Sequence, residues 1–309
     1  MSESAPAWVV PAALTPGASI RVVAPSGPFD ARLVWRGLGW LRQRYEVRFD
    51  RGMFETRGYL AGDDPRREGE LAAALLEPGV SAVICARGGY GASRFAHRLD
   101  WTTLRTSPRW LVGFSDVTAL HVEAAAVRVS SWHAPNVTAL GQGNAEAREA
   151  FVDALEHPRR VRSFAGLDPM FAGRAVGPLF GGNLTLLHAC AAAGRLRVPP
   201  GAVLFLEDVT EQPYRLDRML TTLLVGGHLE AVSGVVLGEF TDCRPGRDGV
   251  TVEAVLRELL AGLGKPVASG LPCGHGLTNV PLLFGARATL TVEPNRVALG
   301  FEPPSTRID

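Results

Sequence analysis

The sequence lacks the residue spacings that indicate a metal site or a disulfide framework. Its four cysteines are scattered and form no CxxC pair, and its seven histidines show no HExxH or comparable ligand spacing. In a reducing compartment, isolated cysteines of this kind are expected to be buried thiols. The sequence therefore predicts no metal and no other cofactor.

The chain also lacks an excess of charge of one sign and a long apolar run. Its 32 basic and 31 acidic residues leave a formal charge of +1, so no positive field indicates a nucleic-acid or anionic membrane partner. No apolar run approaches the roughly 20 residues that cross a bilayer. The first 20 residues contain Glu3 and three prolines and lack the basic start and apolar core of a signal peptide. We expect a cytoplasmic protein.

The length of 309 residues suits two domains, each large enough to bury its own core. Residues 161–174 mix charged residues, proline and glycine without clear periodicity, which is typical of a linker. We therefore expect an N-terminal domain over residues 1–160 and a C-terminal domain over residues 175–309.

Short apolar runs alternate with amphipathic stretches in the first half of the chain. The expected strands are 20–24, 46–49, 80–86 and 110–114, and the expected helices are 31–45, 66–76, 92–98 and 117–127. This alternation predicts an α/β domain with a parallel sheet covered by helices on both faces. Such sheets carry their chemistry beyond the carboxyl ends of their strands.

The second half shows fewer strand and helix signals. The expected strands are 203–206, 232–237 and a pair within 286–299 around Glu293-Pro294-Asn295, and the expected helices are 215–224 and 252–263. These elements predict a smaller α/β or α+β domain.

Ser115 lies in the sequence Gly-Phe-Ser-Asp, where an apolar strand meets a helix. A serine on such a turn exposes its hydroxyl above the sheet, next to the free N–H groups of the helix. Residue 117 is valine, so the segment is not the GxSxG nucleophile elbow. Ser115 or Asp116 could equally cap the helix.

Residues 87–91, Arg-Gly-Gly-Tyr-Gly, form a second strand-to-helix turn. Closely spaced glycines let backbone N–H groups approach an oxyanion or a phosphate. The segment matches neither GxGxxG nor the Walker pattern, which argues against a nucleotide site. A tight turn with positive φ explains the same glycines.

Glu207 and His275 are the remaining candidates. Glu207 follows the apolar strand 203–206, where it could orient a histidine or end the strand in solvent, and His275 stands between two glycines in a loop. Taken with Ser115, they supply a nucleophile, an orienting carboxylate and a base, the parts that a serine hydrolase needs.

The chain resembles the LD-carboxypeptidases, a family that includes muropeptide carboxypeptidases and microcin C immunity peptidases. The resemblance runs from residue 20 to about residue 287. Its most specific stretches are 20–26 (IRVVAPS), 58–62 (GYLAG), 85–91 (CARGGYG), 113–116 (GFSD), 181–184 (GGNL), 206–208 (LED), 213–220 (PYRLDRML) and 274–276 (GHG).

The resemblance implies that Ser115 is the nucleophile, His275 the general base and Glu207 its orienting carboxylate. It implies an oxyanion hole formed by the backbone N–H groups of Asp116 and of a glycine in the 87–91 loop, for which we choose Gly89 over its neighbour Gly88. It further implies a flavodoxin-like N-terminal domain, a smaller C-terminal domain of the swivelling β/β/α type, a site between the two domains, and a homodimer.

Members of the family act on two kinds of substrate. One branch removes the terminal D-alanine of cytosolic murein tetrapeptides during peptidoglycan recycling, and the other hydrolyses the amide of aminoacyl-nucleotide toxins. Either substrate needs an anchor for its anionic group, and Arg87 and Arg215 lie in family-like motifs, although an ion pair of Arg215 with Asp217 explains Arg215 equally well.

We favour the carboxypeptidase because no aromatic residue that could stack on a base lies in 181–187, and Phe180 only precedes this segment. A non-catalytic binding module and a glutamine-amidotransferase-like enzyme remain as alternatives of other classes. The first would tolerate loss of the triad residues, and the second would need cysteine at position 115.

Overall fold

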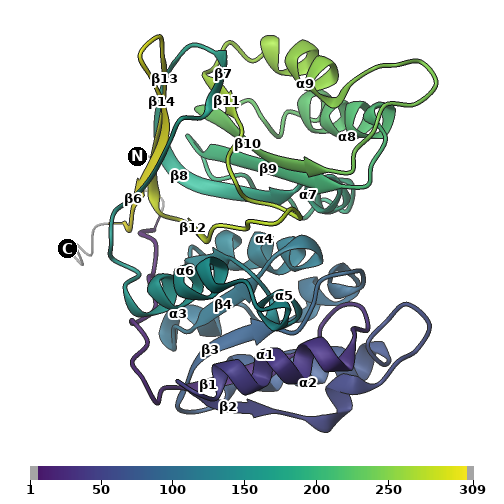
Figure 1. Ribbon diagram of the computed structural model, residues 1–309, viewed down its shortest axis with the longest axis vertical. Coiled ribbons are helices and arrows are strands. Elements are labelled where there is room, and N and C mark those ends of the chain that lie inside the picture. The colour runs from purple at the N-terminus through teal and green to yellow at the C-terminus, as the bar shows by residue number, and fades with distance from the viewer. Residues whose placement is uncertain (1–5, 305–309) are drawn as a thin grey trace.

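The computed structural model describes residues 6–304. They form two halves, each built on its own sheet, that lie one above the other in Figure 1. The first sheet has the strand order β2-β1-β3-β4-β5-β12, and its first five strands are parallel. Its strands are β1 (Ser19–Val23), β2 (Glu46–Phe49), β3 (Val80–Cys85), β4 (Trp110–Gly113), β5 (Ser131–His133) and β12 (Leu282–Phe284). The order 2-1-3-4-5 is that of flavodoxin, so the predicted fold class of this half is confirmed.

Helices cover both faces of the first sheet, as a parallel sheet requires. Along β1 the side chains alternate: Ile20 and Val22 pack into one apolar cluster, and Val23 packs into the other. The helices around this sheet are α1 (Ala31–Leu41), α2 (Asp64–Leu76), α3 (Thr103–Thr106), α4 (Thr118–Ala126), α5 (Val137–Gln142) and α6 (Ala145–Glu156).

The second sheet has eight strands in the order β6-β14-β13-β8-β9-β10-β11-β7. The strands β8 to β11 are mutually parallel, and β13 and β14 form an antiparallel hairpin beside β8. These strands are β6 (Arg162–Ala165), β7 (Asp168–Phe171), β8 (Gly173–Asn183), β9 (Val203–Val209), β10 (Gly234–Thr241), β11 (Val267–Ser269), β13 (Arg287–Glu293) and β14 (Arg296–Glu302). The associated helices are α7 (Leu184–Ala192), α8 (Pro213–Val225) and α9 (Val252–Ala261).

The two halves are connected through the sheets as well as through the chain. After the loop that holds His275, β12 leaves the C-terminal half and pairs antiparallel with β5, with Leu282 opposite His133. In Figure 1, β12 lies at the junction of the two halves. The backbone of the C-terminal half therefore completes the N-terminal sheet and sets the position of the His275 loop above it.

Some expected elements differ from the observed ones. Residues 92–98 form two short 3-10 turns, η2 (Ala92–Arg94) and η3 (Ala96–Arg98), because Phe95 between them is not helical (φ −135°, ψ −13°). Helix α1 ends at Leu41, and residues 42–44 form a turn. Residues 161–174, expected as a linker, hold β6 and β7, which form the two edges of the second sheet. The domain limits themselves stay a prediction.

The other expected strands and the helices 215–224 and 252–263 are confirmed to within a few residues. Within residues 6–304, no helix combines the length and the apolar character needed to span a membrane.

Candidate active site

Ser115 lies on a strained turn directly after β4. It begins the 3-10 turn η4 (Ser115–Val117) and has a φ of 66°, one of four positive values among the described non-glycine residues. Such a backbone costs about 1–3 kcal/mol and is found most often at functional sites. The turn is tight, because a Cβ on Gly113 would lie 2.9 Å from the Val117 side chain. A short connection between strand and helix therefore presents the serine side chain above the sheet.

The glycine loop after β3 packs against this serine. A Cβ on Gly88 would lie 2.8 Å from the Ser115 Cβ, so only glycine fits there. Gly89 has a φ of 102°, which also favours glycine. The Gly27 N–H donates to the Gly88 carbonyl over 3.0 Å. This bond joins the loops after β1 and β3, which meet where the strand order reverses and where such folds bind ligands.

The Asp116 side chain holds the same loop in place. Its carboxylate is fully buried and accepts a hydrogen bond from the Ala92 N–H over 2.9 Å. Burial raises the pKa of this carboxyl. Among residues 6–304, the backbone N–H groups of Gly89 and Asp116 donate to no protein acceptor. Two free donors therefore flank Ser115, while the Asp116 side chain has a structural contact that the sequence did not reveal.

His275 and Glu207 form a hydrogen-bonded pair. The Nδ1 of His275 lies 2.8 Å from Oε2 of Glu207, whose side chain is completely buried, whereas the imidazole is 18% exposed. The ring of Phe114, the residue before Ser115, lies 4.9 Å from the imidazole centroid. Ser115 and His275 line one cavity, although no hydrogen bond joins them in the described part of the chain.

The two adjacent acids at the end of β9 have different partners, because successive side chains of a strand point to opposite faces. Glu207 contacts His275, while Asp208 accepts hydrogen bonds from the Asn183 side chain and from the N–H and hydroxyl of Thr185. Burial raises the pKa of the Asp208 carboxyl. Asp208 thus fastens the start of α7, and Glu207 alone of the two acids contacts His275.

The glycines beside His275 are explained by Glu239 on β10. A Cβ on Gly274 would lie 3.1 Å from the Glu239 Cβ, and one on Gly276 would lie 1.9 Å from its Oε2. The loop therefore rests directly on the Glu239 side chain. The flanking glycines are visible in the sequence, but this support is not, because it depends on a contact between distant segments.

The cavity at Ser115 has a volume of about 390 Å³ and lies between the two halves. Arg87 lines it, and one guanidinium nitrogen of Arg87 donates to the Pro28 carbonyl. Arg215 does not line it: this exposed side chain on α8 lies 3.5 Å from Glu211, which is its ion-pair partner in place of the expected Asp217. The structure thus brings only the first of the two candidate arginines to the cavity.

The segment 181–184 joins the halves next to the serine. A Cβ on Gly182 would lie 2.5 Å from the Thr118 hydroxyl, and this hydroxyl accepts a hydrogen bond from the Asn183 N–H. Phe180 is completely buried and packs near Phe284, with ring centroids 6.2 Å apart. The glycines allow close approach of the two halves, and Phe180 is not available to a ligand.

No group of three or more metal-binding side chains occurs within residues 6–304. The cavity is lined by a serine, a histidine paired with a buried carboxylate, and Gly89 with its free backbone N–H, an arrangement that defines a candidate serine-hydrolase site on an α/β scaffold.

Comparison with known sequences gives the family. Residues 20–134 match the LD-carboxypeptidase N-terminal domain, and residues 176–290 match the LD-carboxypeptidase C-terminal domain. The chain therefore belongs to the LD-carboxypeptidase family and is a peptidase of the carboxypeptidase type.

Two curated relatives extend this result. A putative carboxypeptidase of Streptomyces coelicolor is 41% identical over 94% of this chain and 96% of its own length. The murein tetrapeptide carboxypeptidase of Pseudomonas aeruginosa is 36% identical over 77% of this chain and 81% of its own.

Solved structures share the fold. The muramoyltetrapeptide carboxypeptidase from Oxalobacter formigenes superposes with a TM-score of 0.84 at 30% identity and covers 93% of this chain and 100% of its own. The microcin C7 self immunity protein MccF, in complex with aspartyl sulfamoyl adenosine, reaches 0.85 at 20% identity and covers 95% and 98%. At that identity the second likeness concerns the fold alone.

Proposed function

We propose that this protein is a serine carboxypeptidase that removes the terminal D-alanine from murein tetrapeptides in the cytoplasm, as part of peptidoglycan recycling. The observation that carries the proposal is the Glu207–His275 hydrogen bond at the wall of the cavity that contains Ser115. The names of the Pseudomonas and Oxalobacter relatives support the choice of substrate.

In this proposal the imidazole of His275 is the general base. When its Nδ1–H donates to Glu207, the lone pair lies on Nε2, which faces no protein partner in the described residues. Nε2 takes the Ser115 hydroxyl proton as Oγ attacks the scissile carbonyl, and the imidazolium then gives that proton to the departing amine. In the second step His275 takes a proton from water, the hydroxide attacks the acyl–serine ester, and the imidazolium returns a proton to Ser115 Oγ as the shortened peptide leaves. The buried Glu207 charge stabilises the imidazolium in both steps.

The developing oxyanion is assigned to the free backbone N–H groups of Gly89 and Asp116. Each lies beside Ser115, and neither is used by another protein acceptor among residues 6–304. Gly88 contributes by its lack of a side chain, since its Cα faces the serine. Loss of one such donor typically costs about 3 kcal/mol of transition-state stabilisation.

Arg87 is assigned to the terminal carboxylate of the substrate. It lines the cavity of Ser115 and forms no ion pair with an acid in the described residues. Its one protein bond, to the Pro28 carbonyl, fixes the guanidinium and leaves other N–H groups for a carboxylate. A carboxypeptidase requires such a cation beyond the scissile bond.

Aminoacyl-nucleotide cleavage is the second candidate, favoured by the fold shared with MccF. A nucleotide substrate would need a ring on which the base could stack. Among the described residues that line the cavity, Phe114 is the one with a benzene or indole ring, and it packs against His275. This composition supports the murein peptide over the nucleotide.

The deciding experiment is incubation of the purified protein with murein tetrapeptide and, separately, with aspartyl sulfamoyl adenosine, followed by mass spectrometry. We expect release of D-alanine from the peptide and little cleavage of the nucleotide. Ser115→Ala is expected to lower turnover at least about 10³-fold. Ser163→Ala, an exposed serine on β6, is the matched control. Cleavage of the nucleotide alone would replace the proposed substrate, and full activity of Ser115→Ala would reject the nucleophile.

A further inference from the structure

Two tyrosines beside the glycine loop are exposed to solvent and contact each other. The side chain of Tyr59 is 67% exposed and that of Tyr90 is 48% exposed. Their rings meet edge to face, with centroids 5.7 Å apart. Tyr90 directly follows Gly89, so the pair lies beside the proposed oxyanion hole, outside the cavity of Ser115.

The backbone under both rings is fastened. Tyr59 lies in a turn closed by reciprocal bonds between Arg57 and Leu60, and the next residue, Ala61, donates to the Ser26 carbonyl over 2.9 Å. The Tyr59 carbonyl also lies against Gly27, the residue that is bonded to Gly88. A tyrosine on a fixed backbone loses little conformational entropy on binding, which suits a ligand contact.

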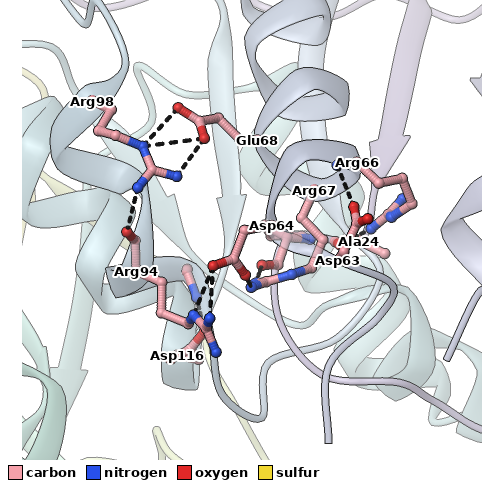
Figure 2. A network of polar contacts seen from close by, with 11 residues as sticks. Ala24, Asp63, Asp64, Arg66, Arg67, Glu68, Arg94, Arg98 and Asp116 are labelled. Carbon is pink, nitrogen blue, oxygen red and sulfur yellow. Dashed lines mark hydrogen bonds and ion pairs between the residues drawn. The ribbon is translucent and has the colours of Figure 1, made fainter. Parts of the chain in front are cut away.

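The segment after Tyr90 is equally constrained. A Cβ on Gly91 would lie 2.5 Å from the guanidinium of Arg67, and Arg67 is buried and bonded to the Pro25 carbonyl and to Asp64. Figure 2 shows Asp64 between Arg67 and Arg94. The Ala92 N–H, just after Gly91, donates to the Asp116 carboxylate. The ion pairs of Asp64 with Arg67 and Arg94 thus constrain the backbone that follows Tyr90.

A second cavity, of about 440 Å³, opens beside Tyr59. Its polar lining consists of the side chains of Arg57, Asp63, Asp64 and Arg94. Arg57 forms no ion pair among residues 6–304, so its guanidinium is free to donate. An aromatic face next to planar charged groups suits a sugar ring, which presents C–H groups on its faces and hydroxyls at its edge.

We propose that Tyr59, Tyr90 and this second cavity form a subsite for a sugar attached to the N-terminal end of the peptide substrate. The proposal rests on the carboxypeptidase function proposed above. A carboxypeptidase cuts the last bond of a tetrapeptide, so a muramoyl group at the other end lies three residues away, or roughly 10 Å along an extended chain. Gly88 packs against Ser115 and so marks the position of the scissile bond. The Cα of Tyr90 lies at most about 7 Å from that of Gly88, and the Tyr90 side chain adds to this reach, which is comparable with the distance to the sugar.

The test compares two substrates with the same peptide, a muramoyltetrapeptide and the free tetrapeptide. Tyr59→Ala and Tyr90→Ala are each expected to lower kcat/KM for the muramoyl substrate about 3- to 10-fold. The free tetrapeptide should be cleaved at an unchanged rate. Tyr214→Ala removes a ring of similar exposure on α8 and serves as the control that should change neither value.

Several outcomes would overturn the subsite. Equal losses on both substrates would show a structural effect of the rings, and unchanged discrimination in both variants would show that the sugar does not bind there. A changed sedimentation coefficient with unchanged discrimination would mark the pair as an interface between copies of the chain. Failure of the wild-type protein to cleave either substrate would instead reject the proposed function.

Discussion

Gly88 and Ser115 lie in such close contact that a Cβ on residue 88 would be 2.8 Å from the serine Cβ and 3.0 Å from its hydroxyl oxygen. Gly88 does not have one of the positive φ values, so alanine is strained there by the contact alone. Gly88→Ala should therefore displace the serine and lower kcat about 100-fold, the scale of a 1 Å misplacement.

The matched control for this change is Gly69→Ala, within α2. A Cβ at residue 69 meets nothing within 4 Å. Alanine there should leave kcat unchanged and raise the free energy of unfolding by about 0.5–1 kcal/mol. Wild-type kcat in Gly88→Ala would show that the serine does not depend on this contact.

Substitutions of the neighbours Glu207 and Asp208 should have different effects, the first on kcat and the second on thermal stability. Glu207→Gln keeps the size of the side chain and removes the charge that stabilises the imidazolium, so kcat should fall on the order of 10³- to 10⁴-fold, with little change in thermal stability. Asp208→Asn keeps one acceptor oxygen and replaces the other with an NH2 group, so the buried donors of either Asn183 or Thr185 lose their acceptor, at a cost of about 1–3 kcal/mol of stability. Steady-state kinetics and thermal denaturation distinguish the two effects, and the assigned roles fail if Asp208→Asn proves the more damaging to kcat.

Arg87 should act on substrate binding more than on the chemical step. Arg87→Gln is expected to raise KM for the peptide acid about 10-fold or more, the cost of losing a charge-assisted hydrogen bond. A peptide with a C-terminal amide lacks the anionic group and should respond much less. The control is Arg215→Gln, since Arg215 is exposed and lies outside the cavity. Equal losses with the acid and the amide would argue against a carboxylate anchor.

Acid should destabilise the fold through two buried histidines. Burial lowers the pKa of His121 to about 4 and that of His133 well below its ordinary value, and both nitrogens of His133 are without a partner in the described chain. Both rings stay neutral in the native protein while the unfolded chain binds protons below pH 6.5. The stabilisation is therefore complete above that pH and is lost as the pH falls toward 4, by about 3 kcal/mol for His121.

His133→Phe tests this pH dependence. The aromatic neighbours Phe205 and Phe284, with centroids 5.1 and 5.7 Å from the imidazole, should accept a phenyl ring. Denaturant unfolding between pH 4 and 7.5 should show a smaller loss of stability in this variant than in the wild type. His97→Gln, at an exposed position, should follow the wild-type curve. Identical acid slopes in wild type and His133→Phe would contradict the assignment.

Local pattern predicted the N-terminal half well. Apolar runs such as 80–86 and the helical stretches between them led to the parallel sheet, and its flavodoxin-like order is confirmed. The sequence pattern did not predict strands that are short or that pair with distant segments. β6 and β7 lie in a stretch without periodicity, and β12 is only three residues long. Their strand character comes from partners elsewhere in the chain, and propensity over so few residues carries little information.

The sequence by itself determined the family, the alternation of strands and helices, and the identities of the candidate residues Ser115, Glu207 and His275, whose roles stay predictions. The tertiary structure decided what the adjacent Asp208 contacts, which of two arginines reaches the cavity, and why the loops need glycine. These outcomes depend on which face of the sheet each side chain points to, on β12 crossing to the first sheet, and on approaches between distant segments that leave no room for a Cβ. Residue order alone does not specify such contacts, because each arises only when segments far apart in the sequence are packed together.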